Sequence, residues 1–169
     1  MFDDALPDGW GLLVLDRYLQ SIGQKPSELD LLDRLALVGK SGRGALEFVP
    51  DKSVSQPSQV AEIEFLGREV AALLDDKDYF GEHIKELYQR GGSPGGARPK
   101  VFLRADGEEW LVKFPAKNDP KSIGSTEYQY ALLARECGIE MPDVRLFWGE
   151  YFGVRRFDRN ADGKLHVVL

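Results

Sequence analysis

The chain has 169 residues, of which 43% are hydrophobic and 30% charged, and this is enough to bury a core as one domain or two small ones. Its net charge of −6 argues against broad, nonspecific nucleic-acid binding, although Arg155, Arg156 and Arg159 form a local basic cluster. The single cysteine, Cys137, excludes an intrachain disulfide, and no apolar run is long enough to span a membrane. Because no signal-peptide pattern is present either, we expect a cytoplasmic globular protein.

Two helices are expected in the first fifty residues. Apolar residues recur at helical spacing from Trp10 to Ile22, and Gly23 would end that helix. A second helix would begin with Ser27 as its N-cap and Asp30 as the capping-box partner, and it would end at Gly39. The residues expected on its buried face are Leu31, Leu32, Leu35 and Ala36.

Residues 38–44, Val-Gly-Lys-Ser-Gly-Arg-Gly, contain the Gly-Lys-Ser end of a Walker A phosphate loop. That loop also needs a glycine where Arg34 stands and a strand where this chain predicts a helix. We therefore interpret the segment as a helix-to-strand turn and expect a strand at 45–49. Proline, serine and charge in residues 51–57 predict a linker between an N-terminal subdomain, 1–50, and a second part, 58–169.

Residues 58–90 predict two amphipathic helices. The first would be capped by Ser58 and would end at the acidic residues 75–78. The second would cover 79–89. The apolar residues expected to face inward are Val60, Ile63, Leu66, Val70, Leu73, Leu74, Phe80, Ile84, Leu87 and Tyr88. We interpret the acidic cluster as a solvated helix end, since metal ligands must converge from several elements, and His83 as a surface or partly packed residue.

Residues 91–100, Gly-Gly-Ser-Pro-Gly-Gly-Ala-Arg-Pro-Lys, hold four glycines and two prolines, which suit neither a helix interior nor a central strand. Two short strands would follow, at 101–103 and 110–114, joined by a turn at Asp106-Gly107. Lys113 interrupts the apolar run of the second strand. A glycine-rich loop, a hairpin and such a lysine are how a protein kinase holds ATP, but a flexible linker before an ordinary hairpin would have the same residues.

The rest of the chain predicts one helix and several strands. The helix would run from Ile123 to Cys137, with Gly138 after it and Cys137 as a buried, unreactive thiol. Glu127 in its first turn suits the helix dipole, and it also stands where a kinase has the glutamate that pairs with its ATP-binding lysine. The expected strands are 144–148, 151–157 and 164–169, with His166 on an exposed face.

This order predicts an α+β fold, with a small N-terminal helical and strand subdomain followed by a protein-kinase-like small lobe of antiparallel sheet plus helix. In such a lobe Lys113 would neutralise phosphate charge and Glu127 would hold Lys113 in place. Strand residues 153–157 would offer backbone groups to an adenine edge. The residues expected to bind the nucleotide are Gly95, Gly96, Ala97, Arg98, Pro99, Lys100, Lys113, Glu127, Arg155, Arg156 and Phe157.

Several motifs resemble the HipA family of bacterial serine/threonine-kinase toxins. Their order and spacing are similar to the family's, and the similarity runs nearly end to end. The matching segments are 2–9, 93–100, 111–115, 127–128 with 132–134, 138–142 and 156–159.

The resemblance implies that Ser93 corresponds to an autophosphorylation site whose modification turns the loop out and inactivates the kinase. It also implies that Lys113 binds ATP phosphates and that strand 155–157 is the hinge to adenine. A member of this family would use ATP and Mg²⁺ to phosphorylate a cytoplasmic protein such as an aminoacyl-tRNA synthetase, in a toxin–antitoxin pair linked to persistence. Its partner would be a HipB-like DNA-binding antitoxin, with DNA contacted only through that antitoxin.

Two departures from the family pattern limit this expectation. Family strands that precede the Phe2 segment are absent, and the large lobe with the catalytic aspartate and the Mg²⁺ ligands would lie beyond Leu169. We therefore expect an N-terminal piece of such a kinase, inactive alone, with no catalytic residue or metal ligand of its own. A non-catalytic module that contacts a partner kinase or antitoxin, and an α+β domain whose glycine-rich loop is only a linker, remain as alternatives.

Overall fold

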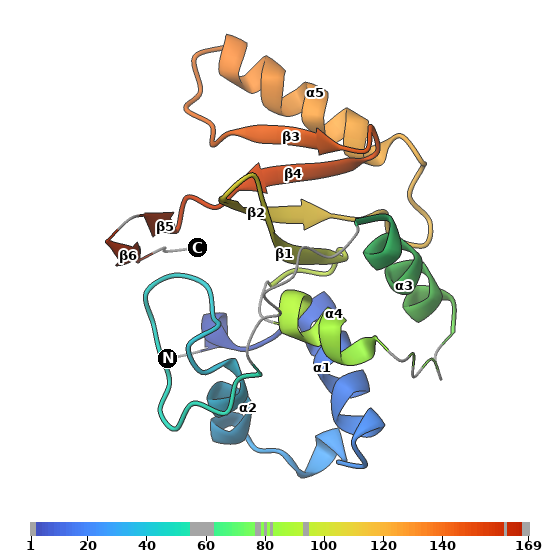
Figure 1. Ribbon diagram of the computed structural model, residues 1–169, viewed down its shortest axis with the longest axis vertical. Helices are drawn as coiled ribbons and strands as arrows, with labels where there is room; N and C mark the ends of the chain where they lie inside the picture. The colour runs from blue at the N-terminus through green and yellow to red at the C-terminus, as the bar shows by residue number, and fades with distance from the viewer. Residues whose placement is uncertain are drawn as a thin grey trace.

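The computed structural model describes residues 3–54, 63–76, 79, 81, 83–92, 95–160 and 162–166. Figure 1 shows a sheet in the middle of the molecule, with α5 on one side and the helices α1, α3 and α4 on the other. Predicted features at Ser58, Val60, Phe80, Ser93 and 167–169 lie outside the described residues. Within the described part of the chain, no helix is both long enough and apolar enough to cross a membrane.

The first predicted helix is confirmed. After the 3₁₀ turn η1 (Asp3–Ala5), α1 spans Gly9–Ser21, and Gly23 follows it with a φ of +77°. Its buried side chains recur at helical spacing, and Trp10, Val14, Leu15 and Leu19 are at most 1% exposed.

The second helix, α2, is shorter than predicted. It spans Leu31–Val38, and Pro26–Glu28 form a separate 3₁₀ turn, η2. Asp30, not Ser27, is the N-cap, because its carboxylate accepts from the N–H of Asp33 at 2.8 Å while the Asp33 carboxylate accepts from the N–H of Asp30. This later start turns the first residues of the helix outward: Leu31 and Leu32 are 47% and 71% exposed, so the prediction that both are buried is wrong.

The predicted strand at 45–49 does not form. After α2 the chain bends and returns to the C-terminal end of that helix. The N–H of Phe48 donates to the carbonyl of Gly39 at 3.1 Å, and the N–H of Lys52 donates to the carbonyl of Ala36 at 2.8 Å. These bonds use backbone groups that a neighbouring strand would need, so the segment is a turn-rich loop.

Two helices follow in the described residues. Helix α3 spans Ile63–Asp75 and ends where the acidic cluster was expected to end it, and α4 spans Ile84–Gly91, starting later than predicted. The ring of His83, which precedes α4, packs edge-on against Phe65. Among the residues that the structure describes, no group of three or more His, Cys, Asp or Glu side chains could hold a metal ion.

Four antiparallel strands form the main sheet in the order β1-β2-β4-β3. Strands β1 (Lys100–Ala105) and β2 (Glu108–Lys113) are joined by the predicted Asp106-Gly107 turn, where both residues have positive φ, as a type I′ turn requires. Strands β3 (Val144–Phe147) and β4 (Tyr151–Arg155) form the second hairpin. This sheet and α5 give the predicted α+β architecture of a kinase-like small lobe.

Helix α5 spans Ile123–Glu136 and packs against β3 and β4. Cys137 follows it and is exposed, so the prediction of a buried thiol is wrong. Two short strands, β5 (Arg159–Asn160) and β6 (Gly163–Lys164), form a small separate hairpin, and His166 beyond it is exposed as expected.

One hydrophobic core joins the helices to the sheet. It combines buried residues of α1, α3 and α4 with Val101 of β1 and Val112 of β2, both 0% exposed. The indole Nε1 of Trp10 in α1 also donates to the carbonyl of Lys100 in β1 at 2.8 Å. The start of α1 is therefore fixed next to the glycine-rich segment. The predicted division of the chain into a subdomain (1–50), a linker (51–57) and a second part (58–169) stays a prediction.

Candidate functional site

The end of β2 and the first turns of α5 are joined by an ion pair. Nζ of Lys113 donates to Oε2 of Glu127 at 2.8 Å, and the two side chains are 33% and 25% exposed. The ammonium also lies 5.3 Å from the ring centroid of Phe152 in β4. The structure thus brings together the two charged residues that the sequence singled out, from positions 14 residues apart.

A small cavity lies against this ion pair. Its volume is about 10 Å³, which is room for about one water molecule. The residues that line it are Arg98, Lys113, Phe114, Pro115, Ile123, Gly124, Glu127 and Phe152. The glycine-rich segment, the lysine strand and the first turns of α5 therefore meet at one place.

The described part of the glycine-rich loop is held at both ends. On one side Nζ of Lys100 donates to the carbonyl of Gly95 at 2.6 Å. On the other, Arg98 forms an ion pair of 2.7 Å with Asp119, whose carboxylate also accepts from the N–H of Ala116 at 2.9 Å. Residues 96–98 are exposed, so a solute can reach this part of the loop.

Lys100 is a buried cation beside the glycine-rich loop. The residue is only 8% exposed, and burial lowers the pKa of its ammonium. The nearby charges of Lys113 and Arg43 lower this pKa further, whereas those of Asp8 and Glu127 oppose the shift. Lys100 is therefore a largely desolvated cation at the loop, and an anion bound there would lie close to its ammonium.

The expected adenine-binding strand end is held by paired arginines. The guanidinium of Arg156 is 4% exposed, contacts both carboxylate oxygens of Asp158 at 2.7 and 2.9 Å, and stacks 3.9 Å from the ring centroid of Phe102. Arg155 pairs with Asp143 at 3.2 Å, while Phe157 is 61% exposed.

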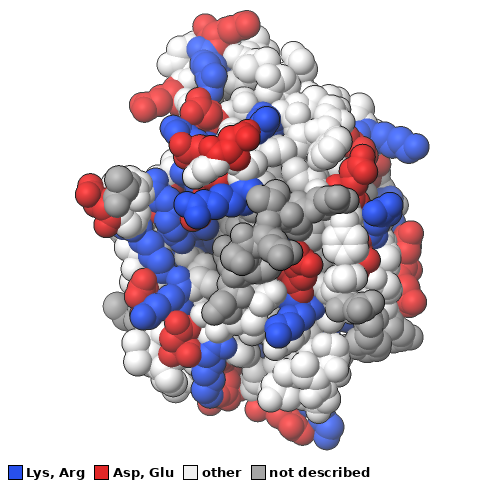
Figure 2. Space-filling model, in the orientation of Figure 1, with Lys and Arg blue, Asp and Glu red and all other residues white. Residues whose placement is uncertain are grey.

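The backbone of this segment is partly committed to the sheet. The N–H of Arg155 donates to the carbonyl of Asp143, and the N–H of Arg156 donates to the carbonyl of Glu109, both at 2.8 Å. An adenine edge would therefore have to use other backbone groups near Phe157. Acidic and basic side chains are interspersed over the face that Figure 2 shows. The arginines of this segment do not form a free basic patch, because Asp158 binds both Arg156 and Arg159.

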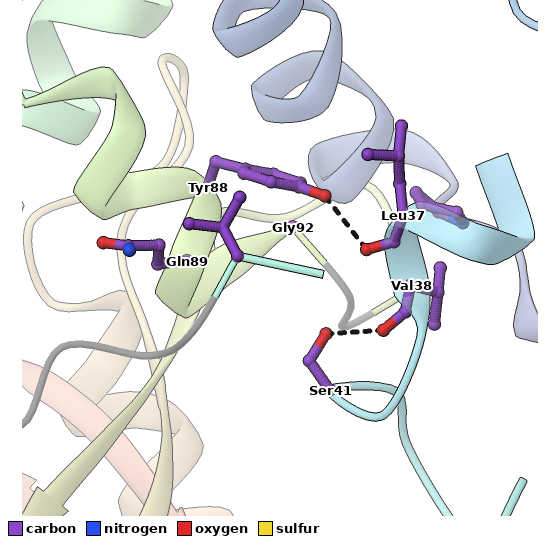
Figure 3. A pocket seen from close by; sticks show the side chains of 8 residues that line it. Leu37, Val38, Ser41, Tyr88, Gln89 and Gly92 are labelled. Carbon is purple, nitrogen blue, oxygen red and sulfur yellow. Dashed lines mark hydrogen bonds between the residues drawn. The ribbon is translucent and has the colours of Figure 1, made fainter. Parts of the chain in front are cut away.

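The Gly-Lys-Ser segment has a structural role at the end of α2. The hydroxyl of Ser41 donates to the carbonyl of Val38 at 2.8 Å, and the hydroxyl of Tyr88 donates to the carbonyl of Leu37 at 3.1 Å. Figure 3 shows these two bonds on either side of a pocket of about 10 Å³. Ser41 is thus used within its own turn, in agreement with the interpretation that this is not a Walker A loop.

Sequence reasoning missed three long-range hydrogen bonds. Oδ1 of Asp8 accepts from the N–H of Gly96 at 2.6 Å, across 88 positions of sequence. The N–H of Gly44 donates to Oδ2 of Asp158 at 3.1 Å, and Arg159 donates to the carbonyl of Gly42 at 3.0 Å. Burial raises the pKa of Asp158, but the hydrogen bond and charge of Arg156 outweigh it, so that pKa lies below its ordinary value.

Residues 92–168 match the family model described as "HipA-like C-terminal domain". This part of the chain resembles the HipA family. Over 182 aligned residues, which include 98% of this chain, the sequence is 24% identical to "Putative kinase Y4dM" of Sinorhizobium fredii. The chain spans 42% of the length of that protein.

Proposed function

We propose that this chain forms the nucleotide-binding small lobe of a HipA-like serine/threonine-protein kinase. The observation that carries the proposal is the 2.8 Å ion pair between Lys113 and Glu127, beside a glycine-rich loop and on an antiparallel sheet. In protein kinases, a lysine held by a helix glutamate contacts the ATP phosphates. The match of residues 92–168 to the HipA-like family supports the same role.

In this proposal each described element has one task. Backbone N–H groups of the exposed residues 96–98 bind phosphate oxygens, with that of Gly96 leaving its bond to Asp8, and Lys113, oriented by Glu127, neutralises the phosphate charge. The adenine ring lies near Phe157. ATP supplies the phosphoryl group, and the Mg²⁺ ligands and the catalytic base are expected outside this chain.

The biological setting follows from the family resemblance alone. We propose that the full kinase is a toxin that phosphorylates a cytoplasmic protein of the aminoacyl-tRNA synthetase type and is neutralised by a HipB-like DNA-binding antitoxin. In this setting Ser93 would be the autophosphorylation site that inactivates the kinase.

Mg-ATP binding measured by calorimetry tests the nucleotide site. We expect weak binding that is lost in Lys113→Ala, because the phosphates lose the cation beside them. Lys117→Ala is the matched control, since Lys117 pairs with Asp75 of α3 at 3.2 Å and does not line the cavity beside Lys113. Equal binding by wild type and Lys113→Ala would contradict the proposal. No binding by either would favour the alternative of a non-catalytic module that contacts a partner kinase or antitoxin.

A further inference from the structure

Asp8 stands at the N-cap of α1 but does not cap that helix. Its backbone is extended, with φ −125° and ψ 167°, as N-cap residues usually are, yet its side chain accepts no hydrogen bond from the first turn. Instead Oδ1 of Asp8 accepts from the N–H of Gly96 in the glycine-rich loop at 2.6 Å. A short hydrogen bond to a carboxylate is a strong one, so the Asp8 side chain binds the loop and not the first turn of the helix.

The backbone on either side of this contact fits closely. The N–H of Trp10 donates to the carbonyl of Gly96 at 3.1 Å, so both backbone groups of Gly96 are bonded to the start of α1. Gly9 has a φ of +44°, and a Cβ on it would lie 2.8 Å from Cα of Ala97. These contacts bring the Asp8 carboxylate and the loop close together.

The carboxylate also lies among cations. A Cβ built on Gly95 would lie 2.7 Å from Nη2 of Arg43 and 2.8 Å from Oδ1 of Asp8, which places both groups beside the same loop residue. Lys100 donates to the carbonyl of Gly95, and the charge of Asp8 acts to raise the pKa of its ammonium. A loop N–H, a guanidinium and an ammonium together are the groups that would bind a phosphate oxygen.

We propose that Asp8 is a built-in competitor for phosphate at the glycine-rich loop. Its carboxylate occupies the N–H of Gly96, and a bound phosphate oxygen takes its place. This inference rests on the proposed function, because it assumes that the loop receives nucleotide phosphates. Asp8 thereby sets how tightly the small lobe binds a nucleotide, and the start of α1 becomes part of the nucleotide site.

Asp8→Asn is the variant that isolates the charge. The amide retains an oxygen that can accept from Gly96 but removes the negative charge that repels phosphate. Asp4→Asn is the matched control, because Asp4 is a neighbouring exposed acid whose described contact with Arg43 is made by its backbone carbonyl, at 3.3 Å. Asp8→Ser, smaller and neutral, serves as a second variant should Asp8→Asn fail to fold.

Calorimetric titration with Mg-ATP, ADP and AMP should rank the variants. We expect Asp8→Asn to bind Mg-ATP roughly 3- to 10-fold more tightly than wild type, with a smaller gain for AMP, and Asp4→Asn to change the affinity less than about 2-fold. High salt should shrink the gain, because it screens exposed charges. Binding by Asp8→Asn where wild type shows none would support the proposal most strongly.

Other outcomes separate the two proposals. If Lys113→Ala abolishes binding but Asp8→Asn and Asp8→Ser bind Mg-ATP no more tightly than wild type, the nucleotide site stands and the role of Asp8 is wrong. An equal gain in Asp4→Asn would also overturn it, since the effect would then be one of net charge. If neither wild type nor any Asp8 variant binds a nucleotide, both proposals fail.

Discussion

At the scale of single residues, Trp10 is the side chain that fixes the start of α1 under the loop. It is 1% exposed, and its Nε1 donates to the carbonyl of Lys100. We expect Trp10→Phe to lower the free energy of unfolding by about 1–3 kcal/mol, because a buried carbonyl loses its donor while most of the packing stays. Urea unfolding followed by circular dichroism measures this.

Trp148→Phe is the control for that experiment. Trp148 lies in the turn between β3 and β4 and is 68% exposed, so the loss of its indole N–H should change stability little. If both variants are destabilised equally, the effect comes from the exchange of side chain and the Trp10 bond to Lys100 is not responsible.

At the scale of elements, the contact between α5 and the β3–β4 hairpin depends on the absence of a side chain at Gly124. A Cβ there would collide with the carbonyl oxygen of Glu150 and lie 3.1 Å from the N of Phe152. We expect Gly124→Ala to cost about 1–3 kcal/mol of unfolding free energy, because backbone cannot yield as a flexible side chain can. Since Glu127 lies one turn further along α5, the variant should also weaken Mg-ATP binding.

Gln129→Ala provides the comparison on the same helix. Gln129 is exposed, and alanine has a higher helix propensity than glutamine, so this variant should be neutral or slightly stabilising. A Gly124→Ala protein as stable as Gln129→Ala would show that α5 can move away from the hairpin without a loss of unfolding free energy.

The same scale shows what the sequence could predict. The pairing of β1 with β2 and the positions of Lys113 and Glu127 follow from local turn and helix signals, and the structure has them together. The predicted cap of α2 was Ser27, with Asp30 as its capping-box partner. Asp30 is itself a good N-cap residue, and only its bond to Asp33 decides between the two. The contact of Asp8 with Gly96 joins residues 88 positions apart, and no periodic pattern encodes it.

At the scale of the whole molecule, Asp158 connects the loop after α2 with the segment after β4. Its carboxylate accepts from Arg156, Arg159 and the N–H of Gly44. Arg159 reinforces the contact by donating to the carbonyl of Gly42. This buried cluster holds the first part of the chain against the end of the sheet, close to the proposed adenine site.

The pH dependence of stability tests this cluster. The folded pKa of Asp158 lies below the ordinary value of 3.8, so its stabilising effect is fully present above that pH and is lost as pH falls through the lower folded value. We expect Asp158→Asn to cost roughly 2–3 kcal/mol at neutral pH, less than removal of a buried partner usually costs, because Glu109 still pairs with Arg156 at 3.2 Å. In urea unfolding at a series of pH values, the difference between wild type and variant should stay constant down to about pH 4 and then narrow. A difference that persists unchanged below pH 3.8 would show that the Asp158 charge does not hold the two segments together.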